Sequence, residues 1–208
     1  MNKGFFISFE GTDGCGKSTQ IKLLAEYLKS KGREVVISRE PGGSPVGEKI
    51  REILLNADNV EISSMCELFL FEAARAQHMD QIVMPALNEG KIVILDRFID
   101  SSIAYQGFGR QLGVECVETF NHYAIGGRYP DVTLMLELSP ETAFVRKGGN
   151  DVKDRMEMTG NDFFKRVGEG LSFAAEKYSD RIICVNVEGT CQETHARICE
   201  IIDKAIGE

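Results

Sequence analysis

The sequence predicts an α/β fold in which a five-stranded parallel sheet is covered by helices on both faces. Short apolar runs alternate along the chain with longer segments whose apolar residues recur every three or four positions. The strand predicted over residues 91–95 is nearly uninterrupted in its hydrophobicity, which is typical of a parallel strand buried on both faces. Strands that alternate with helices are joined by right-handed crossovers, so we expect ligands beyond the carboxyl ends of the strands.

The predicted strands are short apolar runs bounded by glycine, proline or polar residues. The first of them is followed at once by Glu10 and Asp13, and its apolar part is too short for a signal peptide. In chain order the strands span residues 5–9, 34–38, 91–95, 132–138 and 181–187.

The predicted helices carry their apolar residues on one face. Gly32 is the stop signal of the first helix, and the last helix aligns Ile198, Ile201 and Ile202. In chain order the helices span residues 17–31, 46–56, 64–88, 101–106 and 114–125, a segment from residue 140, residues 162–178, and a final segment after the fifth strand. A glycine- and proline-rich loop at residues 40–45 and a polar, glycine-containing stretch at residues 146–154 interrupt this pattern.

Length and charge limit the kinds of partner. A chain of 208 residues suits a single domain over residues 1–208. The formal net charge of -8 argues against a nucleic-acid polymer, which favours a basic surface, whereas a few local cations suffice to hold a small anion. No apolar run approaches the roughly 20 residues that span a bilayer, so we expect no membrane partner.

The six cysteines are scattered, and none forms a Cys-x-x-Cys pair, which argues against zinc. Cys184, Cys191 and Cys199 fall in or beside predicted core elements and are expected to be buried thiols. This usage fits a reducing cytoplasm.

A glycine-rich phosphate loop follows the first strand and fits the pattern G-x-x-x-x-G-K-[ST]. Its glycines let backbone N–H groups surround a phosphate, and the N-terminus of the next helix adds partial positive charge. Lys17 is expected to reach the β- and γ-phosphates, and the Ser18 hydroxyl to ligate Mg²⁺. The loop, which predicts a nucleoside triphosphate ligand and most simply ATP, consists of Gly11, Thr12, Asp13, Gly14, Cys15, Gly16, Lys17 and Ser18.

The third strand ends in Asp96 and Arg97. Asp96 takes the place of the acidic residue that holds Mg²⁺ beside such a loop, directly or through a bound water. Arg97 follows it, where a guanidinium fork would grip a second phosphate. A structural ion pair at the strand end is the alternative. A cation here fits a phosphorylated acceptor better than it fits water.

Phe71 and Arg75 are four residues apart and share a face of the predicted helix, so a ring and a guanidinium would meet a nucleobase together. The alternative is a core phenylalanine beside a solvated arginine. Arg39 and Arg51 flank the loop at residues 40–45, and each taken alone is a surface charge.

Four stretches together resemble the family of bacterial thymidylate kinases. These are Phe9-Glu10-Gly11 leading into the phosphate loop, Arg39-Glu40-Pro41-Gly42-Gly43, Phe71 with Ala73-Ala74-Arg75, and the run DRFIDSSIAYQG from Asp96 to Gly107. Asp154-Arg155-Met156-Glu157 and Phe163-Phe164 resemble the family's lid and the helix after it. The resemblance covers essentially the whole chain in order, and it implies a P-loop kinase fold with a short mobile lid at about residues 146–160.

The resemblance implies the reaction ATP + dTMP → ADP + dTDP with Mg²⁺, carried out by a homodimer. Arg97 would bind the acceptor phosphate, Phe71 would stack on thymine and Arg75 would bond its O4 edge. The remaining implied acceptor contacts are Ser102 and Gln106 along the base, Tyr105 near the deoxyribose, Asp13 at the 3′-hydroxyl, and Glu40 and Arg51 in the pocket wall.

The implied catalytic set is Lys17, Asp96, Arg97, Asp13 and a lid cation. Arg146 is the best match to the lid arginine that reaches ATP, and further lid cations are Lys147, Lys153 and Arg155. The family also has a cis proline in the loop that corresponds to Glu40-Pro41. The histidines are assigned no role.

Two other functions fit parts of the pattern. The first is a kinase of another nucleoside monophosphate or of a deoxynucleoside, which an acceptor panel would separate. The second is a nucleotide-dependent switch that binds without transfer. The sequence contains no guanine-reading Asn-Lys-x-Asp, and Arg97 would be idle in a switch.

Overall fold

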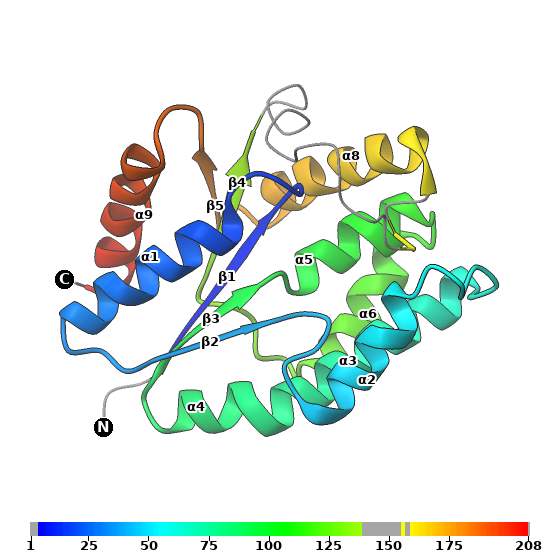
Figure 1. Cartoon of the computed structure of the whole chain (residues 1–208), viewed down its shortest axis with the longest axis horizontal. Coiled ribbons are helices and arrows are strands. Elements are labelled where there is room, and N and C mark those ends of the chain that lie inside the picture. The colour runs from blue at the N-terminus through cyan, green and yellow to red at the C-terminus, as the bar shows by residue number, and fades with distance from the viewer. Residues whose placement is uncertain (1–3, 139–154, 157–158, 208) are drawn as a thin grey trace.

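In the computed structural model, which describes residues 4–138, 155–156 and 159–207, a five-stranded sheet lies between two layers of helices (Figure 1). The strands are β1 (Phe5–Gly11), β2 (Val35–Arg39), β3 (Ile92–Asp96), β4 (Val132–Glu137) and β5 (Ile182–Asn186). Their order is β2-β3-β1-β4-β5, and every neighbouring pair is parallel. The predicted fold class is confirmed, and all five predicted strands are present with ends shifted by at most two residues.

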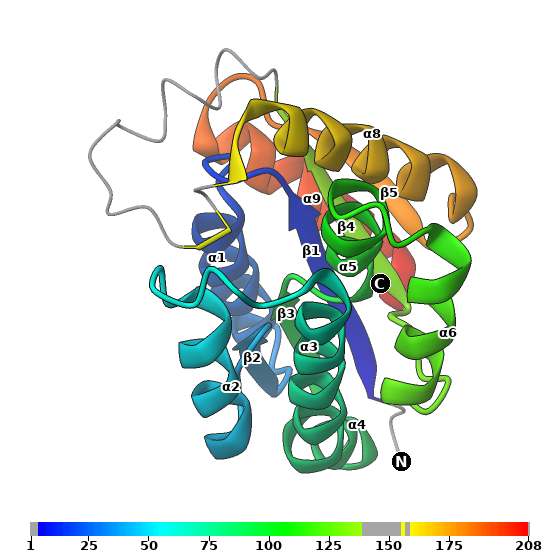
Figure 2. The same ribbon diagram turned by 90° about the vertical axis from the view of Figure 1, so that its right-hand side faces the viewer.

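Helices cover both faces of the sheet (Figure 2). One face packs against α1 (Lys17–Ser30) and α9 (Cys191–Ile206). The opposite face packs against α4 (Met84–Asn88), α5 (Ile99–Ser102) and α8 (Asn161–Lys177). The remaining helices lie at the edge of this second layer and are α2 (Pro45–Leu55), α3 (Ser64–His78) and α6 (Val114–Ala124).

The central strands β1, β3 and β4 are buried on both faces, as the continuous hydrophobicity of residues 91–95 predicts for β3, whereas the edge strands β2 and β5 are partly exposed. Successive residues of β1 point to opposite sides, so Phe6 packs on the ring of Phe98 while Ile7 and Phe9 join the core beneath α1. The sheet is therefore a rigid base for the loops at its carboxyl edge.

Two predicted helices contain π-helical segments. The stretch predicted at residues 64–88 is continuous, but η1 (Met79–Val83) separates α3 from α4. Pro85 has no N–H and its ring would collide with a carbonyl one turn earlier, and the wider π turn before it relieves both conflicts. The helix predicted at residues 101–106 begins earlier, as α5, and continues as η2 (Ile103–Gly109).

The prediction that three cysteines are buried was wrong. Cys184 and Cys191 are exposed and Cys199 is only half-buried, because β5 is an edge strand and α9 lies at the surface. Cys15, in the phosphate loop, is buried instead. The helix predicted from residue 140 lies outside the described residues. Within the described ranges, no helix is both long enough and apolar enough to cross a membrane.

Gly170 marks the place where α8 meets η2. A Cβ at this position would lie 2.7 Å from the Cα of Ala104, in the segment that also carries Tyr105. We expect Gly170→Ala to lower the free energy of unfolding by about 1–3 kcal/mol, because the two backbones would have to separate. Gly168→Ala is the matched control: its Cβ would meet nothing within 4 Å, and alanine favours a helix over glycine by about 1 kcal/mol. Urea unfolding checks both, and equal effects would contradict this packing.

Candidate active site

The phosphate loop joins β1 to α1, where the sequence predicts it. Gly11 has φ 133°, and a Cβ there would lie 2.6 Å from the carbonyl oxygen of Leu136 on β4, so only glycine fits. The Lys17 Nζ donates to the carbonyl oxygens of Gly11 and Thr12, each at 3.0 Å. Burial, and then the charge of Arg97, lower the pKa of Lys17. Lys17 and Arg97 are thus close enough to repel each other, and an anion bound between them would relieve that repulsion.

Ser18 and Asp96 come together beside the loop. The Ser18 hydroxyl donates to Oδ2 of Asp96 at 2.9 Å. A hydroxyl and a carboxylate are hard oxygen ligands of the kind Mg²⁺ prefers, and Mg²⁺ ordinarily takes only one or two protein ligands beside phosphates and water. No group of three or more His, Cys, Asp or Glu side chains able to hold a metal occurs in the described part of the chain. The donor set therefore fits a magnesium ion that arrives with a phosphate ligand.

Arg97 sits in a tight turn directly after β3. Its φ is 67°, a left-handed conformation that is uncommon for a residue with a side chain, and its N–H donates to the carbonyl of Phe9 at 2.9 Å. The guanidinium donates to Asp13 at 2.6 Å and to Ser101 at 3.1 Å, and it lies 5.2 Å from the centre of the Tyr105 ring. These contacts fix the guanidinium beside the phosphate loop, to which Asp13 belongs.

A cavity of about 430 Å³ opens onto the phosphate loop at the carboxyl edge of the sheet. Its size falls in the range of small-molecule sites. The loop contributes Lys17 and Ser18, and Asp96 completes this end of the wall. Every residue that the sequence assigns to the acceptor lines it: Asp13, Glu40, Arg51, Phe71, Arg75, Arg97, Ser102, Tyr105 and Gln106.

Arg75 is the most fully engaged cation of the cavity wall, with only 2% of its surface exposed. Its Nε donates to Glu40 at 2.7 Å, one terminal nitrogen donates to Glu72 and Asn121 at 2.6 Å each, and the other donates to Ser102 at 3.0 Å. Four of the five N–H groups of the guanidinium thus have partners among the described residues, and the fifth is available for a ligand in the cavity.

Phe71 and Arg75 share a face of α3 and both line the cavity, as their spacing predicts. The alternative of a solvated Arg75 is wrong, because that side chain is buried. Tyr105 extends from η2 and packs edge-on against Phe163 of α8, with 6.1 Å between ring centres. Two aromatic walls thus lie in a cavity that also contains cations.

The sequence did not reveal the partners of Glu40. This buried carboxylate accepts from Arg75, and its other oxygen lies 3.1 Å from Nδ1 of His78. The Nε2 of His78 lies 2.8 Å from the hydroxyl of Ser38 on β2. The Glu40-Pro41 bond is cis, as the resemblance implies. No spacing pattern links these positions, since they meet only when α3 folds over the loop after β2.

Glu67 is a second polar centre that sequence reasoning missed. It is fully buried and accepts from Gln106 at 2.9 Å, from Arg110 at 2.9 Å and from Arg155 at 2.7 Å. Burial alone would raise the pKa of Glu67, but the hydrogen bonds and charges of its partners lower it overall. Gln106 is thereby held by the carboxylate that also holds Arg155.

Arg155 is not a lid cation that reaches ATP. Its side chain is 7% exposed, and its Nε donates to the carbonyl of Leu54 at 2.7 Å while a terminal nitrogen contacts Glu67 at 2.7 Å and the Met156 sulfur at 3.5 Å. The guanidinium therefore fastens the chain to the body of the protein. Arg146, Lys147 and Lys153 lie outside the described residues, and the role of Arg146 stays a prediction.

A smaller cavity of about 210 Å³ lies on the other side of the phosphate loop. It is bounded by Thr19 and Gln20 of α1 and by Gly189, Thr190 and Cys191 at the start of α9. The Gln20 amide donates to the carbonyl of Cys191 at 3.0 Å and ties the two helices together. No sequence pattern predicts this cavity, because its walls come from opposite ends of the chain.

Comparisons with known proteins agree with this geometry. The family model described as thymidylate kinase matches residues 9–198. A thymidylate kinase of Thermoanaerobacter sp. (strain X514) is 45% identical over 202 residues, which cover 97% of this chain and 98% of the relative. A thymidylate kinase of Finegoldia magna is 48% identical over 165 residues, 79% of this chain and 81% of the relative. The crystal structure of thymidylate kinase from Ehrlichia chaffeensis superimposes with a TM-score of 0.80 at 33% identity, covering 96% of this chain and 99% of that one.

Proposed function

The chain belongs to the thymidylate kinase family, and we infer that it transfers the terminal phosphoryl group of ATP to dTMP, forming dTDP. The observation that carries this inference is one cavity that contains all of the predicted acceptor residues and opens onto the phosphate loop. Phosphoryl transfer requires a donor and an acceptor phosphate in line, and this arrangement provides a cationic site for each.

We place the acceptor phosphate on Arg97 and the thymine ring against Phe71. The left-handed turn and the contacts with Asp13 and Ser101 support this role for Arg97, because they aim a guanidinium fork into the cavity. The unused N–H of Arg75 would donate to O4 of thymine, and cytosine offers a donor there instead. The other proposed acceptor contacts are Ser102 and Gln106 with the base, Tyr105 with the deoxyribose, Asp13 with the 3′-hydroxyl, and Glu40 and Arg51 in the wall.

We place the triphosphate of ATP on the loop from Gly11 to Ser18. Lys17 would exchange its two carbonyl partners for the β- and γ-phosphates, a move that its buried position favours because the phosphate restores a counter-charge. The smaller cavity lies where the donor's base and sugar would follow from the loop, between α1 and the start of α9.

We assign Mg²⁺ to the Ser18 and Asp96 oxygens, with Asp96 contacting it directly or through water. When bound, the ion neutralises charge on the phosphates during transfer. The protein keeps the Ser18 and Asp96 oxygens beside the phosphate loop. The hydrogen bond between these two side chains supports a site that is arranged before the ion binds.

Catalysis in this site depends on positioning and on cations. The acceptor phosphate is already a good nucleophile, so no strong general base is required. Lys17, Arg97 and the lid cation, for which Arg146 is our assignment, would surround the moving phosphoryl group. A lid over about residues 146–160 would exclude water, which otherwise accepts the phosphoryl group.

We propose a homodimer that forms through α3 and α6. Met65 and Phe69 are one turn apart on α3 and are 37% and 49% exposed, and Phe69 stacks edge-on with Phe120 of α6. Tyr123, further along α6, is 78% exposed. Exposed apolar side chains on two helices joined by this ring contact suit an interface with a second copy. The single five-stranded sheet supports treating residues 1–208 as one domain per subunit.

Phe69→Glu is expected to shift the protein from dimer to monomer, because a charge would be buried in the interface. Sedimentation equilibrium of the variant and the wild type checks this. Ile183→Glu is the matched control, since Ile183 is 37% exposed on β5, away from both helices. A wild type that sediments as a monomer would rule out the dimer, and dimeric Phe69→Glu would place the interface elsewhere.

We also propose that the protein works in the cytoplasm. All six cysteines lack disulfides. Free thiols, three of them at least partly exposed on β5 and α9, suit a reducing compartment.

The reaction is tested by measuring ADP release with ATP, Mg²⁺ and a panel of acceptors. We expect dTMP to be used in clear preference to dUMP, dCMP, AMP and thymidine. Preference for another monophosphate or for thymidine would favour the neighbouring kinase functions. Nucleotide binding without ADP release for any acceptor would favour a switch.

A further inference from the structure

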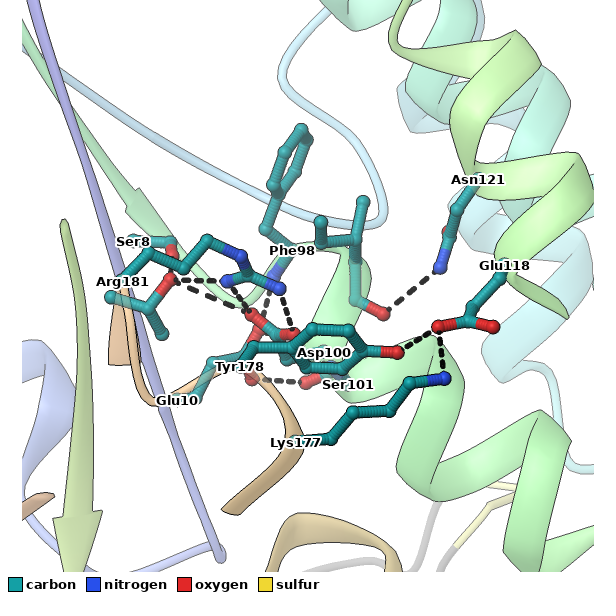
Figure 3. A network of polar contacts seen from close by, with 12 residues as sticks. Ser8, Glu10, Phe98, Asp100, Ser101, Glu118, Asn121, Lys177, Tyr178 and Arg181 are labelled. Atoms are coloured by element: carbon teal, nitrogen blue, oxygen red, sulfur yellow. Dashed lines mark hydrogen bonds and ion pairs between the residues drawn. The ribbon is translucent and has the colours of Figure 1, made fainter. Parts of the chain in front are cut away.

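Glu10 is a buried carboxylate beneath the acceptor site that the mechanism above does not use. It is the residue before Gly11 in β1, and none of its surface is exposed. Figure 3 shows it under the start of α5, where one oxygen accepts from the N–H of Phe98 at 2.8 Å and of Ser101 at 3.2 Å. The other oxygen accepts from the Ser101 hydroxyl at 2.5 Å. Glu10 therefore fastens the backbone on the C-terminal side of Arg97.

The same hydroxyl connects Glu10 to Arg97. Ser101 has one hydroxyl proton, and while it donates that proton to Glu10 its oxygen is free to accept from Arg97, which lies 3.1 Å away. Arg97 is in a left-handed turn, which persists only where the surroundings hold it. Glu10 holds the backbone that follows the turn, through its bonds to the N–H groups of Phe98 and Ser101. It also orients the Ser101 hydroxyl, whose oxygen accepts from the Arg97 guanidinium.

The charges around Glu10 come from several elements. Burial, and then the neighbouring Asp100 of α5, raise the pKa of Glu10 to about 7, against the opposing influence of Arg97 and the hydrogen bonds from Ser101 and Phe98. Asp100 is itself fully buried and accepts from Arg181 at 2.6 Å (Figure 3). Arg181 also faces Glu10, and the further titratable groups around Glu10 and Arg97 are Tyr105 of η2, Asp13 of the phosphate loop and Asp96 at the end of β3. Glu10 thus changes its charge near neutral pH.

We propose that Glu10 is a positioning residue for Arg97, which in its ionised form orients Ser101 and balances the guanidinium, and which releases both when it is protonated. A protonated Glu10 would donate to Ser101 instead of accepting from it, and the serine proton would then compete with the guanidinium for the space between them. The proposal rests on the acceptor-phosphate role proposed for Arg97. It predicts that the ionised form uses dTMP better than the protonated form.

Glu10→Gln tests this proposal because glutamine reproduces the protonated state. Its oxygen can accept from the two backbone N–H groups, while its amide donates to Ser101 as a carboxylic acid would. The readout is kcat/KM for dTMP from about pH 5.5 to about pH 9, which reports the free enzyme. For the wild type we expect a rise through about pH 7. For Glu10→Gln we expect that rise to disappear, with kcat/KM about tenfold lower at about pH 8.

Glu118→Gln is the matched control. Glu118 is a partly exposed carboxylate on α6 that accepts from Lys177 and Tyr178, and it lies on the opposite side of Figure 3 from Glu10. Its profile should match that of the wild type. The phosphate of dTMP also titrates near pH 6, and both variants retain that contribution, so the difference between Glu10→Gln and the control isolates Glu10.

Thermal unfolding separates positioning from a merely structural role. A carboxyl whose pKa is raised on folding, here from 4.5 to about 7, stabilises the fold most below its unfolded pKa, and this stabilisation is lost as the pH rises through about 7. At about pH 8, Glu10→Gln should therefore unfold at the wild-type temperature or higher while its activity is reduced. A purely structural Glu10 would lose stability and activity together.

Ser101→Ala is a second test of the proposal, and it remains informative even if Glu10→Gln does not fold. It removes the bridging hydroxyl and leaves both backbone bonds to Glu10 in place. We expect Ser101→Ala to lower kcat/KM for dTMP and to reduce the rise of kcat/KM through about pH 7 that the wild type shows. A wild-type pH profile in either folded variant would overturn the proposal. A wild type that does not phosphorylate dTMP would instead overturn the proposed function.

Discussion

Arg97→Ala is expected to lower kcat/KM for dTMP by at least about 100-fold, the scale of losing one electrostatic donor to a transition state. The guanidinium is placed by its turn and by its bonds to Ser101 and to Asp13 of the phosphate loop, and it lines the cavity. Steady-state kinetics with dTMP varied at saturating ATP measure the loss.

Arg97→Lys and the acceptor thymidine are the controls for this result. Lysine keeps the charge but not the fork, so we expect it to recover only part of the activity. In binding measurements, the wild type should prefer dTMP over thymidine, and Arg97→Ala should lose most of that preference. An Arg97→Ala variant with near-normal turnover, or one that still separates the two ligands as the wild type does, would remove Arg97 from the phosphate site.

Arg75→Met is expected to lower the free energy of unfolding by about 3–5 kcal/mol, because it leaves two buried carboxylates without their cation. Glu40 and Glu72 pair with Arg75 at 2.7 and 2.6 Å, and the three side chains are 2–8% exposed. Burial already raises the pKa of Glu72, and its second oxygen is buried with no hydrogen-bond partner among the described residues. The cluster therefore depends on the charge of Arg75. Urea unfolding measures the change.

Arg39→Met is the matched control for Arg75→Met. Arg39 pairs with Glu48 at 2.9 Å, but these side chains are 50% and 41% exposed. Exposed pairs of this kind contribute about 0–1 kcal/mol, so the control should unfold almost as the wild type does. Similar losses in the two variants would contradict the account of Arg75 as the buried centre of the acceptor site. Arg75→Met should also weaken discrimination between thymine and cytosine.

Local sequence patterns predicted most of the fold. The central strands were predictable because burial on both faces of a parallel sheet demands continuous apolar runs. The phosphate loop was predictable because its glycine spacing reflects one backbone shape. The acceptor residues came from the resemblance, and their meeting in one cavity required the three-dimensional fold.

Long-range polar contacts were not predictable. His78 and Glu40 are separated by 38 positions, and Glu67 and Arg155 by 88, and nothing in the spacing of either pair indicates that they meet. The contacts of Glu10 were not predictable either, because a single acidic residue after a strand indicates only that the buried segment ends there. Its role depends on the turn at Arg97, and only the folded chain brings the two together.

A crystal structure with dTMP and a non-hydrolysable ATP analogue bound would show directly whether one cavity presents the acceptor phosphate to the phosphate loop. We predict the dTMP phosphate within hydrogen-bond distance of the Arg97 guanidinium, the thymine ring against Phe71 with O4 at Arg75, and the γ-phosphate at Lys17. A dTMP phosphate bound away from Arg97, or a thymine ring outside the cavity, would contradict the account.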